Sequence, residues 1–123
     1  MIISIIKIYP TTESEHTIID VLESVKILIA NLPDCLECSV AVEAEEGGRI
    51  CYMEHWRTRE VLDRHLRSPL YNRVLEAMEL SQAIPEIAFF EVSSVGGLEL
   101  VEKARLSIIY RSEINIKVED KNE

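Results

Sequence analysis

Residues 38–56 read CSVAVEAEEGGRICYMEHW, and this stretch decides the fold. Apolar side chains alternate with others along 38–44, which is the period of a β-strand, and a second strand-like run follows at 50–56. Gly47 and Gly48 stand between the two runs and are free to take positive φ in a tight turn. The stretch therefore predicts two neighbouring antiparallel strands joined as a hairpin.

The simplest register for this hairpin joins Glu46 to Arg49 across the two glycines. The other pairs follow, because residues advance one for one along antiparallel strands. The resulting pairs are Val42 with Met53, Ala41 with Glu54, Val40 with His55 and Ser39 with Trp56.

Helical patterns and further strands flank the hairpin. Upstream, residues 2–9 form an apolar, β-branched run that stops at Pro10, and apolar residues then recur at helical spacing until Pro33. Downstream, Thr58 is positioned to cap a short helix, and Ser68-Pro69 starts another that runs to about Gln82. A last strand is predicted at 87–92.

The predicted order, β-α-β-β-α-β, is that of a ferredoxin-like α+β domain with a split βαβ pattern. Its antiparallel sheet carries helices on one face, which leaves the other face bare and largely apolar. The simplest cover for a bare apolar face is the same face of a second chain related by two-fold symmetry, so we expect a homodimer.

We assign residues 1–97 to this domain and residues 98–123 to a C-terminal extension. Residues 98–105 have the pattern of one or two helical turns, whereas 106–110 and 114–118 have strand-like character. We expect the extension to pack on the dimer partner or to lengthen the sheet.

Composition narrows the possible partners and compartment. With 22 acidic and 13 basic residues the formal charge is −9, so the surface repels the phosphates of nucleic acids and anionic lipids. The apolar run at the N-terminus is too short to span a bilayer. Three cysteines cannot all pair within one chain, which favours a reducing cytoplasm. We expect a cytoplasmic protein that binds neither nucleic acid nor membrane.

The stretch 52–57, YMEHWR, followed by His65 and Ser68-Pro69, resembles the antibiotic biosynthesis monooxygenase family, whose members carry a strand with Glu-x-Trp and then a helix with a His. The resemblance covers roughly residues 1–95. It implies a dimeric α+β barrel whose subunits each hold a small hydrophobic or aromatic molecule between sheet and helices. Known members oxidise quinol-like substrates with O₂ and use neither metal nor flavin, so the resemblance implies no cofactor.

Some members of the same fold degrade haem, and this chain departs from their pattern. That branch uses an Asn in the first strand, a Trp in the helix and a His one helix further on. Here the first strand lacks Asn, His65 stands where the Trp falls, and Leu75 stands where the His falls. Haem is therefore disfavoured as a ligand.

Cofactor-free oxygenation requires a base, a donor for the resulting oxyanion and a dry pocket. His65 is the candidate catalytic residue, because imidazole titrates near neutral pH and its place between Leu62 and Leu66 indicates that it points inward. Candidate substrate-binding residues are Tyr52, Glu54, Trp56 and Tyr71, of which Tyr71 is a weaker candidate, as is His55. We expect His16, in the first turn of its helix, to be exposed.

A structural reading of the same residues stays open: His65 as a satisfied buried histidine, and the aromatic residues as ordinary sheet packing. Two hypotheses follow. The chain is either a small cofactor-independent monooxygenase acting on a quinol or polycyclic phenol, or a non-catalytic dimeric module that binds a small molecule or is purely structural.

Cys35-x-x-Cys38 has the spacing of a redox or zinc motif. A thioredoxin-type pair sits at a helix N-terminus, whereas this pair follows a helix and enters a strand. A zinc site needs two more ligands, and Cys51 and scattered histidines do not supply them. We therefore expect no metal site.

Overall fold

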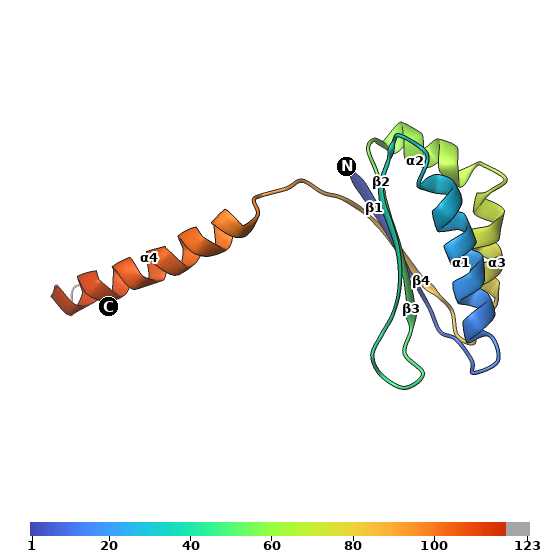
Figure 1. Cartoon of the computed structure of the whole chain (residues 1–123), viewed down its shortest axis with the longest axis horizontal. Helices are drawn as coiled ribbons and strands as arrows, with labels where there is room; N and C mark the ends of the chain where they lie inside the picture. The colour runs from blue at the N-terminus through green and yellow to red at the C-terminus, as the bar shows by residue number, and fades with distance from the viewer. Residues whose placement is uncertain (118–123) are drawn as a thin grey trace. The chain divides into compact units, whose positions relative to one another are not determined.

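The computed structural model describes the backbone of residues 1–117 and the side chains of residues 1–107. It divides into two units, Met1–Val92 and a second that begins at Ser93. Figure 1 shows the elements of both units. In chain order they are β1 (Ile2–Ile8), α1 (Glu15–Ile29), β2 (Cys35–Val42), β3 (Ile50–Trp56), α2 (Arg59–Leu66), α3 (Tyr71–Glu79), β4 (Glu86–Glu91) and α4 (Leu98–Lys117).

The first unit is a four-stranded sheet of order β2-β3-β1-β4 in which every pairing is antiparallel. Helices α1, α2 and α3 lie on one face of this sheet (Figure 1). The predicted ferredoxin-like α+β fold is confirmed.

The core lies between the central strands and the helices. Alternate residues of β1 and β3 point toward the helices and are buried. The fully buried apolar side chains of the strands include Ile6, Ile8, Ile50 and Tyr52, and those of α1 are Ile18, Leu22, Val25 and Ile29. The predicted helical stripe of α1 thus packs on the sheet, as its spacing indicates.

The register predicted for the hairpin is wrong by three residues. The observed partners are Val42 with Ile50 and Val40 with Tyr52. The connection is longer than two residues, because the Glu43 N–H donates to the Arg49 carbonyl at 2.9 Å and the chain turns between them. Since the error is odd, it moves the side chains of β2 to the other face, and Val40 joins the core.

The hairpin loop requires both of its glycines. Gly47 has φ of 69°, and a Cβ on Gly48 would lie 2.3 Å from the Glu43 carbonyl oxygen. The loop is held by Arg49, whose guanidinium binds the carboxylates of Glu43 at 2.7 Å and Glu86 at 2.8 Å. Arg49 thereby joins the hairpin to the start of β4.

Thr58 caps α2 as predicted, its hydroxyl accepting from the Val61 N–H at 3.3 Å. Ser68 does not cap α3, because its hydroxyl donates to the His65 carbonyl at 2.7 Å instead. Helix α3 ends at Glu79 and not near Gln82. Residues 81 and 82 are bound to the end of β1, where the Ser81 hydroxyl accepts from the Tyr9 N–H at 3.0 Å.

In the second unit, the strand-like character predicted for 106–110 and 114–118 is wrong over the described residues: the chain is helical to Lys117, and Val118 lies outside them. A helix satisfies its backbone hydrogen bonds internally, whereas a strand needs a neighbour. The first helical turns predicted from Leu98 extend into one helix, α4.

The sheet face turned away from the helices carries Ile3, Ile5, Met53 and Phe90. These positions alternate with the buried ones along their strands. Phe90 is 49% exposed. Charged side chains such as Lys7 and Glu86 share this face. In the first unit it is thus largely apolar and uncovered, as predicted.

Ser4 is buried in β1 and its Oγ finds no hydrogen-bond partner among the described residues. We expect Ser4→Ala to leave stability unchanged or to raise it by up to about 1 kcal/mol, because the alanine removes an unsatisfied hydroxyl. The matched control Ser81→Ala should lose about 1–3 kcal/mol, since it leaves the Tyr9 N–H unpaired. Urea unfolding of both variants measures this. Clear destabilisation by Ser4→Ala would show that the hydroxyl has a partner, such as a buried water.

Candidate functional site

The site is built around Glu54, whose side chain on β3 is fully buried. Its carboxylate has three partners: the Tyr52 hydroxyl donates to Oε2 at 2.5 Å, the Trp56 indole N–H donates to Oε1 at 3.0 Å, and His65 Nε2 lies 3.0 Å from Oε2. We call these four residues the Glu54 cluster. A buried carboxylate is tolerated where such bonds replace its hydration.

The cluster follows from two periodicities. Tyr52, Glu54 and Trp56 alternate along β3 and point to the same side, toward the helices. Thr58 starts α2 directly after the strand, and within α2 Leu62 and His65 are three residues apart and both buried. The short connection therefore brings the His65 ring over the strand residues that precede it.

Two aromatic contacts hold the imidazole in place. The rings of Trp56 and His65 have centroids 4.6 Å apart with planes tilted by 33°, and Tyr71 meets His65 edge-on at 5.2 Å. Tyr71 comes from the first turn of α3. All five residues predicted for the site, His65, Tyr52, Glu54, Trp56 and Tyr71, thus lie together.

The phenols of the site are protonated near neutral pH. Burial, followed by the nearby Glu54 carboxylate, raises the pKa of Tyr52 far above its ordinary value, and the same two causes raise the pKa of Tyr71 to about 12. Tyr52 is therefore a hydrogen-bond donor to Glu54.

Beside the cluster lies a hollow of about 450 Å³, within the range of small-molecule sites. We call it the His65 hollow. Its lining is Leu32, Pro33, Asp34, Trp56, Val61, Arg64, His65, Ser68 and Leu70. His65 lines this hollow and contacts Glu54 through Nε2, so Nδ1 is the ring nitrogen outside that contact.

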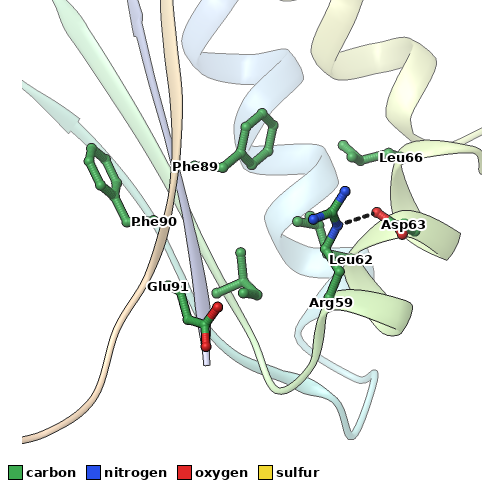
Figure 2. A pocket seen from close by; sticks show the side chains of 8 residues that line it. Arg59, Leu62, Asp63, Leu66, Phe89, Phe90 and Glu91 are labelled. Carbon is green, nitrogen blue, oxygen red and sulfur yellow. Dashed lines mark hydrogen bonds and ion pairs between the residues drawn. The ribbon is translucent and has the colours of Figure 1, made fainter.

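A second hollow, of about 350 Å³, lies against the opposite face of α2 (Figure 2). We call it the Phe89 hollow. Its lining is Ile2, Arg59, Leu62, Asp63, Leu66, Phe89, Phe90 and Glu91. The Arg59 guanidinium is paired with Asp63 at 2.9 Å. None of the residues predicted for the site lines this hollow.

Sequence reasoning missed part of the arrangement. It selected Glu54 and His65 but did not pair them, although both lie at inward positions of their elements. It also missed Arg64 and the 32–34 loop, which line the His65 hollow. Their contribution depends on how the end of α1 meets α2, for which the sequence carries no local signal.

The other two histidines lie elsewhere. The weaker candidate His55 is on the outer face of the sheet, where its Nε2 lies 3.7 Å from the Glu37 carboxylate. His16 is exposed on α1 beside Asp20, as predicted. Burial, the largest cause, raises the pKa of Cys35 and raises that of Cys38 to about 12. These thiols therefore stay protonated and are poor nucleophiles.

Among the side chains that the structure describes, in residues 1–107, no three from His, Cys, Asp or Glu gather as a metal ion would need. Among the helices that the structure describes, none combines the length and the hydropathy that crossing a membrane requires.

The sequence matches the family model described as antibiotic biosynthesis monooxygenase over residues 1–77, which is more than half of the chain. The chain belongs to this family. The resemblance seen in the sequence is thereby confirmed, and the matched residues include every member of the predicted site. No curated protein matches the chain significantly in sequence.

Solved structures support the fold of this monooxygenase family. A putative antibiotic biosynthesis monooxygenase from Deinococcus radiodurans has a TM-score of 0.70 at 18% identity, over 79% of this chain and 97% of that one. A protein from Mycobacterium tuberculosis has a TM-score of 0.68 at 20% identity, over 78% and 98%. A putative member from Caulobacter crescentus CB15 has a TM-score of 0.67 at 17% identity, over 76% and 90%. At such identities the likeness concerns the fold.

The Glu54 cluster predicts a large stability effect. Glu54→Gln should destabilise the protein by about 2–4 kcal/mol, because the amide NH₂ cannot accept from all three donors and faces at least one of them. Glu60→Gln, the same change on an exposed part of α2, should stay within about 0.5 kcal/mol. Urea unfolding compares them. Equal stability of the two variants would contradict the role given to the carboxylate.

Proposed function

We propose that this protein is a cofactor-independent monooxygenase that oxidises a quinol or polycyclic phenol bound in the His65 hollow. The observation that carries the proposal is the hydrogen bond between His65 and the buried Glu54, formed at the wall of a hollow large enough for an aromatic ligand. Family membership supports oxygenation as the reaction class.

His65 is the general base. With Nε2 held by Glu54, Nδ1 takes the proton of the substrate hydroxyl, and the carboxylate stabilises the imidazolium that forms. The bonds from Tyr52 and Trp56 fix the carboxylate, so the ring keeps its orientation through the transfer.

The deprotonated aromatic ring supplies the electrons for O₂. A C–O bond forms between a ring carbon that carries a hydrogen and O₂, and the imidazolium returns its proton to give a hydroperoxide. Loss of that hydrogen as a proton breaks the O–O bond, which leaves a carbonyl on the ring and releases water. One oxygen atom enters the product and the other enters water, with the substrate as reductant.

The non-catalytic alternative has less support. A buried carboxylate–imidazole pair gives little stability compared with apolar packing of the same volume, so its presence needs another reason. Titratable pairs at the wall of a cavity are typical of catalytic sites.

The three free thiols suit a reducing compartment, and we place the protein in the cytoplasm.

We also propose that two copies pair through the sheet face that carries Ile3, Ile5, Met53 and Phe90. This face is largely apolar and is uncovered in the first unit, and a second copy presents the same surface under two-fold symmetry. Such a pairing gives the dimeric barrel implied by the resemblance.

His65→Ala should lower turnover about 10²-fold or more, because it removes the general base. O₂ consumption with anthrone and with 1,4-dihydroxynaphthalene, corrected for autoxidation, measures turnover. His16→Ala, at an exposed position of α1, is the matched control and should keep activity. Unchanged activity of folded His65→Ala, activity that depends on added iron or flavin, or no turnover of any quinol or phenol by the wild type would refute the proposal.

Light scattering should give twice the mass of one chain for the wild type, and Phe90→Glu should halve it. Phe89→Glu is the control, because Phe89 is similarly exposed, at 44% against 49%, yet points to the opposite side of β4 (Figure 2). A wild-type monomer, or equal effects of the two variants, would speak against pairing through this face.

A further inference from the structure

Most polar groups at the His65 hollow are already bound to other protein groups. The polar side chains in its lining are Asp34, Arg64, His65 and Ser68. Asp34 lies 3.5 Å from the guanidinium of Arg57, the Ser68 hydroxyl donates to the His65 carbonyl, and His65 itself binds Glu54. Arg64 is the polar side chain of this lining for which no such partner is found among the described residues.

Arg64 is the positively charged side chain in the lining of this hollow. Its side chain is exposed, and it forms no hydrogen bond or ion pair with any other described residue of the chain. It precedes His65 in the last turn of α2, and His65 is buried. The charge therefore lies at the open side of the hollow, next to the proposed base.

The Phe89 hollow, on the other face of α2, has a more acidic lining. Its arginine, Arg59, is paired with Asp63, and Glu91 adds a further carboxylate (Figure 2). Its lining is therefore net negative. The lining of the His65 hollow carries one carboxylate, Asp34, and one guanidinium, Arg64, so it opposes an anionic ligand less than the lining of the Phe89 hollow does.

We infer that the substrate is an aromatic hydroxy acid. The ring of this ligand lies in the hollow, its hydroxyl points toward His65 and its carboxylate binds Arg64. This inference rests on the proposed function. The rest of the wall is largely apolar, formed by Leu32, Pro33, Val61 and Leu70. A guanidinium binds a carboxylate through two parallel hydrogen bonds, which orients the ligand as well as attracting it.

The helix dipole and the net charge of the protein are two further electrostatic effects at Arg64. A basic residue in the last turn of a helix interacts favourably with the helix dipole, which would give Arg64 a purely structural role. The formal charge of −9 opposes anion binding, but charges beyond about 8 Å are largely screened at physiological ionic strength. A test must therefore separate ligand charge from helix stability.

The test compares 3-hydroxy-2-naphthoic acid with its neutral amide, 3-hydroxy-2-naphthamide, by fluorescence titration near neutral pH. For the wild-type protein the acid should bind on the order of 10-fold more tightly than the amide, as expected for one charge-assisted contact. Arg64→Gln should abolish this preference, whereas Arg59→Gln, the same change on the opposite face of the same helix, should keep it.

Equal binding of acid and amide, failure of the acid to bind, or a preference that survives in Arg64→Gln would overturn the inference. A lower thermal midpoint of Arg64→Gln with an unchanged preference would assign the residue to the helix dipole alone. The titration measures binding and needs no turnover, so the two proposals can fail separately. If no oxygen is consumed, the protein can still bind the acid more tightly than the amide. If acid and amide bind equally, His65 can still act as the general base.

Discussion

The full burial of the Glu54 carboxylate is the constraint on which the rest of the structure depends. A charged group without water must receive hydrogen bonds from the protein, and here the donors are Tyr52, Trp56 and His65. Two of them come from the same strand and the third from α2. The need to satisfy one carboxylate therefore fixes where α2 sits on the sheet.

Helix α2 carries His65 and also separates the two hollows. Its residues 59, 62, 63 and 66 line the Phe89 hollow, whereas 61, 64 and 65 line the His65 hollow. The helix is short, and Thr58 holds its start close to the end of β3. Few residues thus decide which charges face each hollow, and a fold shared by many proteins acquires a site of its own.

Much of the fold and site was predictable because its signals are local. Alternation along β3 predicts that Tyr52, Glu54 and Trp56 share a face, and helical spacing predicts that His65 points inward. The hairpin register was not predictable in this way. A loop closed by Glu43 and Arg49 shifts β2 by three residues, and the pattern of 38–56 alone does not distinguish it from a two-residue turn.

The sequence by itself determined the order of strands and helices in the first unit, the inward residues of β3 and α2, and the family, because each depends on short-range periodicity or a local motif. The tertiary structure decided the Glu54–His65 contact, the two hollows and the place of Arg64, which forms no ion pair with a described residue. These features depend on residues that are distant in the chain, such as Leu32 and Leu70. Such residues come together through the packing of the helices on the sheet, which no local pattern encodes.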